Sequence, residues 1–461
     1  AMGLQGAMNS AVSGLSANGN AMSVIGNNIS NSNTTAYKAN RALFSDVLAQ
    51  EISSAGGNSQ IGRGVNTATV DSDFSQGTFE GTSSNTDLAV DGPGLFIMGE
   101  QGSDTVKYTR DGAFNFNEQG YLVNPTGQRV QGYQVNQNGD TIGDLTNVQV
   151  NTNSSIPAQQ TGLVDLSTNL NADAPVKGST IDLDNPNASA NFATSVNVYD
   201  SLGEKHTLTT YFQKTSSSNN RWNCAITVSQ NEVSGGTAST GDTNDDSNAD
   251  IGTVFEGQIK FTDDGKIDYS DPSSFSLADV TGDGSNTGSL VDSDGDGNID
   301  QVQTNNLQWN NGADTSQEVG YNLNLTQFSG QSEVVRQEQD GYASGNMVDV
   351  NVDQKGNVVA NYSNGESRQE FRLGLAQFAN EDGLTRAGNN LYEATQQSGQ
   401  PAIGMPGSSV GTIRSNSLEQ SNVDIAKQFT DMITTQRAYQ ANSRVISTTK
   451  DMLQEVINLT R

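Results

Sequence analysis

Both ends of this 461-residue chain carry residues at alternating steps of three and four, which is the spacing of a heptad seam along an α-helix. The N-terminal seam comprises Leu4, Met8, Ala11, Leu15, Asn18, Met22, Ile25 and Ile29. The C-terminal seam comprises Ile425, Phe429, Met432, Gln436, Tyr439, Ser443, Ile446, Lys450, Leu453 and Ile457. Ser421, Asn422 or Asp424 is expected to cap the second helix. The sequence therefore predicts terminal helices over 1–30 and 421–461.

Each of these helices needs a partner, because a lone apolar stripe would leave its side chains in water. The two ends can form an intramolecular coiled coil, or they can pack with further copies of the chain. The polar seam residues, among them Asn18 and Gln436, lower pairing stability and restrict the choice of partner. We expect the second arrangement, in which the apolar members of both seams are assembly contacts.

A polar run, "GNNISNSNTTAYKANRALF" from Gly26 to Phe44, follows the first predicted helix directly. Asn, Ser and Thr side chains compete for backbone hydrogen bonds and so end helices. The run predicts that the helix stops here and that 31–70 is an extended, adaptable linker or joint.

The middle of the chain reads as β-rich. Only 33% of all residues are hydrophobic, and the 49 glycines favour short strands and many turns. "LAVDGPGLFIM" places a turn between two strands, and "FNFNEQGYLVN" predicts a hairpin. "MVDVNVDQKGNVVANYSNGE", from Met347, repeats the alternation late in the sequence. We predict a mainly β multidomain protein with α-helical coiled-coil termini.

Charge and cysteine usage exclude several functions. The formal charge of −29, from 23 basic and 52 acidic residues, disfavours nucleic acid and anionic membranes as partners. No stretch approaches the roughly 20 apolar residues of a membrane span, and no cleavable signal peptide is recognised. The single cysteine, Cys224, excludes an internal disulfide and is expected to be a small buried strand residue.

One motif is typical of metal binding. "VDSDGDGNIDQVQ" places Asp292, Asp294, Asp296 and Asp300 around a glycine, as in a calcium loop. Gln303 stands at the twelfth position, where a bidentate Glu is expected, so a solvated acidic turn is favoured and calcium is the alternative. We expect no catalytic or cofactor-binding residues. The one histidine, His206, is expected at the surface, and no nucleophile or phosphate-binding motif occurs.

The N-terminal segment resembles the signature of bacterial flagellar rod and hook proteins, whose usual form is Ser-Gly-Leu, Asn-Asn-Ile-Ala-Asn and Thr-x-Gly-Phe-Lys. The matching residues are Ser13-Gly14-Leu15, Asn27-Asn28-Ile29-Ser30-Asn31 and Thr35-Ala36-Tyr37-Lys38. Ser30, Ala36 and Tyr37 are mild departures. Further similar segments are Gly77–Met98, Tyr108–Tyr133 and Ser417–Leu459, and Val198–Lys214 resembles hook proteins in particular.

Together with the strand pattern, the resemblance implies a nested architecture. The terminal helices would form an inner tube, 71–150 plus 340–415 a split β domain as middle layer, and 151–339 an inserted outer region of one or two subdomains. It also implies a structural, non-enzymatic subunit of the flagellar hook, polymerising into a curved hollow filament that acts as a universal joint.

The partners implied are further copies of the chain, the distal rod, the hook cap and the hook–filament junction protein. The implied location is the extracellular flagellum, reached by flagellar export. A secreted calcium-dependent adhesin or polysaccharide-binding protein is the alternative, suggested by the acidic β-rich middle. It leaves the paired terminal seams unexplained.

Overall fold

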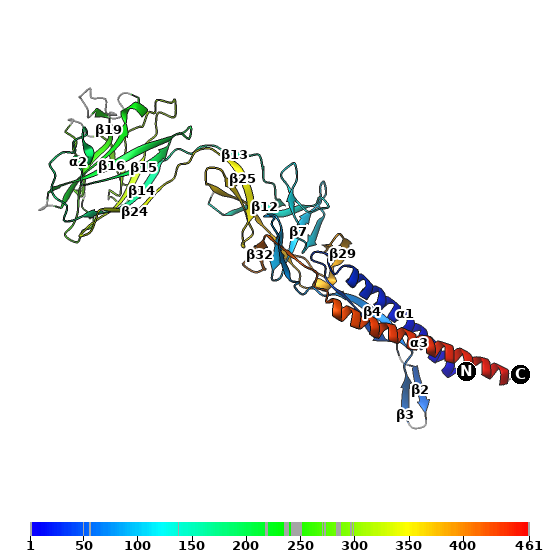
Figure 1. The fold of residues 1–461 in the computed structure, drawn as a ribbon. Coiled ribbons are helices and arrows are strands. Elements are labelled where there is room, and N and C mark those ends of the chain that lie inside the picture. The colour runs from blue at the N-terminus through cyan, green and yellow to red at the C-terminus, as the bar shows by residue number, and fades with distance from the viewer. Residues whose placement is uncertain are drawn as a thin grey trace. The chain divides into compact units, whose positions relative to one another are not determined.

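The chain folds into two compact units. The computed structural model describes residues 2–48, 50–54, 57–136, 138–216, 220–234, 239–240, 251–269, 271, 273–282, 287–295, 297 and 299–459. Unit 1 contains 1–152, 348–361 and 367–461, and unit 2 contains 153–347 and 362–366. Strands dominate, with one long helix at each end of the chain, and this confirms the predicted fold class (Figure 1).

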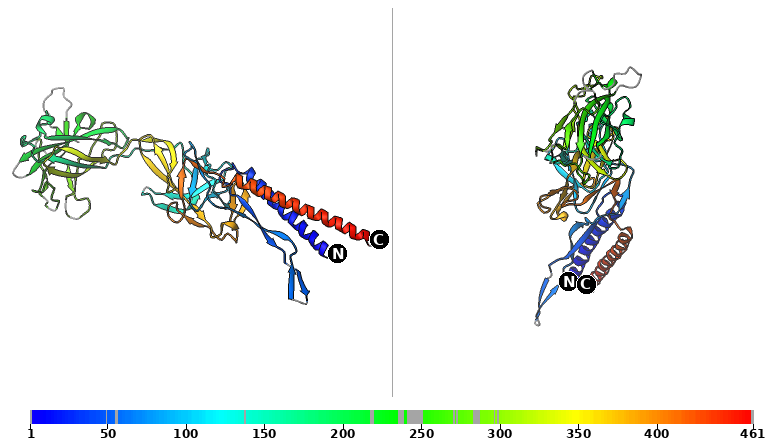
Figure 2. Two further views of the ribbon diagram at one scale, coloured as in Figure 1. Left: turned by 60° about the horizontal axis from the view of Figure 1, so that its bottom comes forward. Right: turned by 90° about the vertical axis from the view of Figure 1, so that its left-hand side faces the viewer.

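Unit 1 carries both long helices, α1 (Met2–Ser30) and α3 (Ile425–Leu459). They pack against each other, and the two chain termini lie at their far ends (Figure 2). Asp424 caps α3, because its Oδ1 accepts the Lys427 N–H at 3.1 Å. Among the described residues, no helix is long and apolar enough to cross a membrane.

The segment predicted as an adaptable linker, 31–70, contains four strands instead. They are β1 (Asn40–Asp46), β2 (Gln50–Ser54), β3 (Gly57–Ile61) and β4 (Val65–Ser72). β1 pairs antiparallel with β4, β2 pairs with β3, and both β1 and β4 contact α1. The helix-ending residues stop at Thr35, and the β-branched residues of β4, such as Thr69 and Val70, favour a strand.

Two short ladders bring the two ends of the chain together next to the helices. β5 (Phe79–Gly81) pairs with β33 (Ser417–Glu419), and β6 (Leu88–Asp91) pairs with β32 (Thr412–Ser415). The 3-10 helix η2 spans Glu381–Gly383. These ladders place the residues just before α3 beside those that follow α1.

The main sheet of unit 1 has the order β25-β26-β27-β11-β7-β8-β30-β29, with β9, β10, β12, β28 and β31 pairing off this path. Leu95, Ile97 and Tyr108 pack with Phe378 and Tyr392 in its core. The strands are β7 (Leu95–Gly99), β8 (Val106–Thr109), β9 (Asn115–Phe116), β10 (Leu122–Val123), β11 (Arg129–Val135), β12 (Thr141–Asn147), β25 (Gly345–Val352), β26 (Asn357–Tyr362), β27 (Ser367–Leu373), β28 (Leu375–Gln377), β29 (Thr385–Gly388), β30 (Leu391–Glu393) and β31 (Ala402–Gly404).

Unit 2 is built from two sheets, with β13 (Ser155–Ile156) pairing with the first residues of β25. One sheet has the order β21-β22-β23-β14-β24 and the other β15-β16-β17-β19-β18, with β20 beside β19. The elements are β14 (Leu163–Asn171), α2 (Pro186–Ser189), β15 (Phe192–Tyr199), β16 (Lys205–Ser216), β17 (Arg221–Ser229), η1 (Gln230–Glu232), β18 (Ser239–Thr240), β19 (Ile251–Lys260), β20 (Phe275–Leu277), β21 (Ser289–Val291), β22 (Gln301–Gln303), β23 (Gly320–Phe328) and β24 (Glu333–Gln339).

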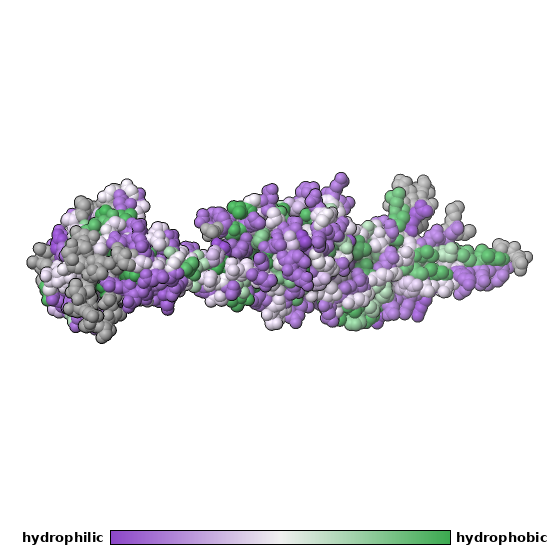
Figure 3. Space-filling model, turned by 90° about the horizontal axis from the view of Figure 1, so that it is seen from above, coloured by the Kyte–Doolittle hydropathy of each residue, from purple (hydrophilic) through white to green (hydrophobic). Residues whose placement is uncertain are grey.

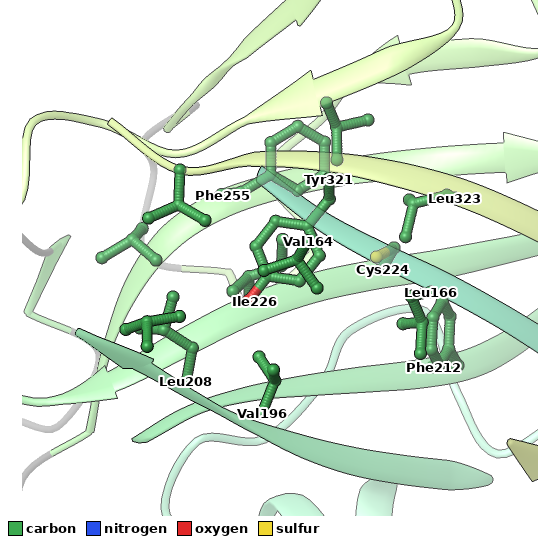
Figure 4. Packing of buried hydrophobic residues seen from close by; sticks show 14 of the residues in the cluster. Val164, Leu166, Val196, Leu208, Phe212, Cys224, Ile226, Phe255, Tyr321 and Leu323 are labelled. Carbon is green, nitrogen blue, oxygen red and sulfur yellow. The ribbon is translucent and has the colours of Figure 1, made fainter. Parts of the chain in front are cut away.

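A single large hydrophobic core joins the two sheets of unit 2 (Figure 4). Leu166 and Leu323 come from one sheet, and Phe212 and Ile226 come from the other. Cys224 is fully buried among them, which confirms its predicted place in a strand, and burial raises the pKa of its thiol. The sequence predicts an insertion over 151–339, whereas unit 2 extends to 347 because β25 begins within it.

Candidate functional site

Small residues are buried along α1, which packs against α3, β1 and β4. Ala11, Ala17 and Ala21 are buried, each less than 9% exposed. A Cβ added to Gly14 would stand 2.7 Å from Nδ2 of Asn442, so the two helices are close at this point. The distance between packed helices depends on the side chains at the contact, and these small residues keep it short.

The predicted seam residues occupy several different faces. Ile25 is buried, while Leu4, Met8, Leu15, Met22, Ile29, Met432, Ile446 and Leu453 are half-buried. Ile425, Phe429, Tyr439 and Ile457 are exposed. The buried positions of α3 include the polar Gln428 and Thr449. The predicted seam included the buried Ala11, but heptad spacing missed the buried Ala17, Ala21, Gln428 and Thr449.

Six large apolar side chains of α3, together called the outer stripe here, are exposed. Its members are Ile425, Phe429, Ile433, Tyr439, Val445 and Met452, each between 42% and 51% exposed. Figure 3 shows hydrophobic residues gathered along this helical part of the molecule. Several large exposed apolar side chains gathered on one helix are typical of an interaction site.

Asn28, in the last turn of α1, ties three segments together. Its Oδ1 accepts the Asn40 N–H at 2.9 Å and the Tyr37 hydroxyl at 3.3 Å. Its Nδ2 donates to the Asn40 carbonyl at 2.8 Å and to Oε1 of Gln428, on α3, at 3.0 Å. Asn28 has no exposed surface, so each of these hydrogen bonds is shielded from water.

A buried ion pair joins the segment after α1 to the segment before α3. Lys38 Nζ donates to Glu419 Oε1 at 2.7 Å and to the Ser75 carbonyl at 2.7 Å, and neither charged side chain is exposed. The same Glu419 oxygen accepts the Gly77 N–H at 2.9 Å, and Arg110 Nε lies 3.6 Å from Oε2. Burial lowers the pKa of the Lys38 ammonium below its usual value, and Glu419 opposes that shift.

Ala36 adopts a left-handed backbone conformation, with φ of 57°, and is 1% exposed. Its N–H donates to the Glu419 carbonyl at 2.8 Å. Glycine reaches this conformation without a Cβ clash. The geometry explains why the signature that this segment resembles usually has Gly at this position.

One further side chain, Asn422, completes the contact region, called the junction below and defined by Asn28, Lys38, Glu419, Gln428 and Asn422. Asn422 Oδ1 accepts the Ala39 N–H at 2.8 Å, and its Nδ2 donates to the Asp73 carbonyl at 2.8 Å. Arg386 Nη2 donates to the Lys38 carbonyl at 2.7 Å. The contacts of Asn422 and Arg386 could not be predicted from the sequence, because their partners lie hundreds of positions away.

The remaining signature residues also make local or junction contacts. Ser13 Oγ accepts the N–H of the first residue of β4 at 3.2 Å. Asn31 Nδ2 donates to the Asn27 carbonyl at 2.9 Å, and the Thr35 carbonyl accepts from Asn390 Nδ2 at 3.0 Å. The signature therefore encodes the end of α1 and its attachment to the strands. Its role in assembly stays a prediction.

The acidic loop of unit 2 turns its carboxylates toward its own backbone. Asp292 accepts the N–H groups of Gly295 at 2.7 Å and Gly297 at 2.8 Å, and Asp300 accepts the Ser293 N–H at 2.9 Å. Asp294 is described, while Asp296 lies outside the described residues. These bonds fit the acidic turn that the sequence favours, and calcium binding stays a prediction.

The prediction that His206 is a surface residue is wrong. The side chain is 5% exposed and stacks on Trp309, with ring centroids 3.6 Å apart. An alternating strand pattern does not say which of its two faces another segment covers. Here the 309–314 loop and η1 cover the His206 face of β16.

Four family models match successive parts of the chain. They are described as flagella basal body rod protein (8–38), flagellar hook protein FlgE/F/G D1 domain (89–166), flagellar basal body protein FlaE D2 domain (169–342) and flagellar basal body rod FlgEFG protein C-terminal (414–459). The two terminal models cover the helices and the junction. Helical ends joined to strand domains in this order define an axial protein of the bacterial flagellum.

Full-length relatives show to which family of flagellar axial proteins the chain belongs. The flagellar hook protein FlgE of Treponema pallidum is 34% identical, covering 98% of this chain and 99% of the relative. That of Escherichia coli is 32% identical, covering 98% and 100%. The solved hook protein FlgE2 of Helicobacter pylori covers 74% of this chain and 100% of its own, with a TM-score of 0.49 and 14% identity. The chain belongs to the flagellar hook protein family.

Proposed function

We propose that this chain polymerises through its terminal helices into the tubular hook of the flagellum, outside the cell. The observation that carries the proposal is the exposed outer stripe of α3. Six large exposed apolar residues on a helix that already packs against α1 need a second partner, and copies of the same chain supply it.

The junction would give each copy a stiff base within this polymer. A universal joint transmits torque while bending, so some part of each subunit has to resist twisting. Lys38, Glu419 and Asn28 are fully buried and held by several hydrogen bonds each, which suits a stiff connection better than an adaptable linker. Bending would then occur between neighbouring copies, where polar surfaces exchange hydrogen bonds with water at small net cost.

Membership of an axial filament also implies neighbours of other kinds. The distal rod, the hook cap and the hook–filament junction protein remain the partners that we propose for the ends of the polymer. Export through the flagellar channel, without a cleaved leader, is part of the same proposal. No catalytic step is needed for any of these roles.

Electron microscopy of the chain under polymerising salt tests the proposal. We expect tubular filaments from the unaltered chain and none from the double variant Phe429→Ser/Ile433→Ser, which removes two apolar side chains of the outer stripe. Val335→Ser is the matched control, because Val335 is 71% exposed but lies in unit 2. Filaments that form as readily from the double variant as from the control would exclude the outer stripe as the assembly surface.

The adhesin alternative makes a different prediction. A calcium-dependent adhesin needs Ca²⁺ at the Asp292 loop, and calorimetric titration of the chain and of Asp292→Asn measures it directly. The full-length match to hook proteins favours assembly over adhesion. Calcium binding in the loop would be compatible with assembly and would add a cation site to the subunit.

A further inference from the structure

A cluster of possible metal ligands lies in unit 2, whereas the long helices and the junction belong to unit 1. Asp200 Oδ2, a Glu204 carboxylate oxygen and a ring nitrogen of His206 all lie within 4.8 Å of one another. Asp200 and His206 are buried and Glu204 is exposed, so the cluster opens to solvent on one side. Among the described residues, this is the one such group of three.

The imidazole of His206 is oriented as metal-binding histidines are. Its Nδ1 lies 2.9 Å from Glu232 Oε2, and its Nε2 lies 3.1 Å from Asp200 Oδ2. The ring stacks on Trp309 with an interplanar angle of 9°. A histidine ligand usually donates its second ring N–H to a carboxylate, which fixes the tautomer and aims the other nitrogen at the ion. Glu232 is placed to accept that N–H.

The two carboxylates are also held in place. Asp200 Oδ1 accepts the N–H groups of Leu202 and Glu204, each at 2.9 Å, and this leaves Oδ2 directed toward His206. Asn311 Nδ2 donates to both Asp200 Oδ2 and Glu204 Oε2, the latter at 2.7 Å. The N–H dipole of this neutral amide partly offsets the repulsion between the two carboxylates, and a cation would offset it more strongly.

We propose that Asp200, Glu204 and His206 bind a divalent first-row transition metal such as Zn²⁺, with water completing the coordination. One imidazole nitrogen and two carboxylates suit Zn²⁺ or its neighbours better than Ca²⁺, which prefers six to eight oxygen ligands. Binding displaces the Asn311 amide from the two carboxylates. The ion then joins the turn after β15 to β16, in addition to the contacts made by the 309–314 loop.

The test is a calorimetric titration with Zn²⁺, and the absorption spectrum with Co²⁺, on the full chain purified without an oligohistidine tag. The chain contains one histidine, so imidazole coordination reports His206 alone. We expect one saturable site, at least about tenfold weaker in Glu232→Gln, which leaves the three ligands intact and replaces the charged acceptor for Nδ1 with a neutral amide. His206→Gln should abolish the nitrogen contribution to the Co²⁺ spectrum.

Two further variants separate the site from general acidity and from misfolding. Asp292→Asn removes a carboxylate from an exposed loop of the same unit and should leave Zn²⁺ affinity unchanged. Asn311→Asp replaces the amide by a further carboxylate and should tighten binding several-fold. Zn²⁺ binding equal in the unaltered chain, Glu232→Gln and a folded His206→Gln would overturn the proposal, and so would the absence of saturable binding at millimolar Zn²⁺.

Discussion

The core of unit 2 and the junction of unit 1 are both buried, but the core consists of apolar side chains and the junction of polar and charged ones. Phe212, Trp222 and Leu323 fill the core of unit 2 with apolar side chains from two sheets. At the junction, the buried side chains include the charged Lys38 and Glu419 and several amides. Apolar burial is non-directional and tolerates adjustment, whereas hydrogen bonds and ion pairs fix geometry. Apolar packing therefore holds unit 2 together, whereas polar contacts fix the geometry of the terminal segments in unit 1.

The largest expected effect comes from removing a large apolar side chain from the core of unit 2. Trp222 is fully buried, and its Nε1 donates to Gln327 Oε1 at 2.9 Å. Trp222→Ala should lower the free energy of unfolding of unit 2 by about 3–5 kcal/mol. Urea titration followed by the fluorescence of Trp309 measures it, because Trp309 is then the one remaining tryptophan. Val335→Ala, at an exposed position, should change it by less than about 0.5 kcal/mol.

Breaking the ion pair tests the polar side. Lys38→Met leaves the Glu419 carboxylate buried without its ammonium partner, which should destabilise unit 1 by about 3 kcal/mol. The double variant Lys38→Met/Glu419→Leu should recover only part of that loss, because the buried Arg110, 3.6 Å from Glu419 Oε2, then lacks its carboxylate partner. Thermal unfolding monitored by helical circular dichroism follows unit 1, which holds both long helices. A double variant less stable than Lys38→Met would show that an unpaired Arg110 costs more than an unpaired Glu419.

A smaller effect sharpens the role of backbone geometry at the junction. Ala36→Gly should stabilise unit 1 by up to about 1 kcal/mol, because the φ of 57° strains alanine and not glycine. Ala17→Gly, inside α1, should instead destabilise it by about 1 kcal/mol. Chemical unfolding of both variants gives the comparison. Equal losses in the two would contradict the left-handed conformation of Ala36.

The smallest effect concerns pH. The Ser75 N–H donates to Asp73 Oδ1 at 2.9 Å, and this bond holds the pKa of that carboxyl below its usual value. A depressed pKa stabilises the fold above the unfolded-state pKa, and the gain is lost as pH falls through the folded-state value. Asp73 is exposed, so we expect less than about 0.5 kcal/mol. Asp73→Asn should be slightly less stable than the unaltered chain at neutral pH and equal to it in acid.

The elements that depend on local sequence patterns could be predicted from the sequence. Seam spacing predicted both long helices, alternation and glycine turns predicted the strands, and Cys224 was predicted as buried. Heptad spacing could not separate the face of α3 that meets α1 from the face that is exposed, because both lie on one helix with apolar residues on each. Only the structure therefore distinguishes the outer stripe from the face of α3 that packs against α1.

The junction was beyond prediction for a different reason. Lys38 and Glu419 are 381 positions apart, and no pattern within a window of residues pairs them. The same holds for the site at His206, where Glu232 and Asn311 come from separate segments. The linker prediction was wrong from Asn40 onward, because the helix-ending Asn, Ser and Thr residues stop at Thr35 and the prediction extended their effect to residue 70.

The wide separation of the Lys38–Glu419 pair has a consequence for the order in which the chain folds. Unit 2 is almost one continuous stretch, so its sheets can form as soon as that stretch is available. The junction instead closes a loop that spans most of the chain, and such a loop closes late. A chain delivered gradually, from either end, presents a finished junction only when both of its ends have arrived. A formed junction therefore indicates that the whole subunit is present.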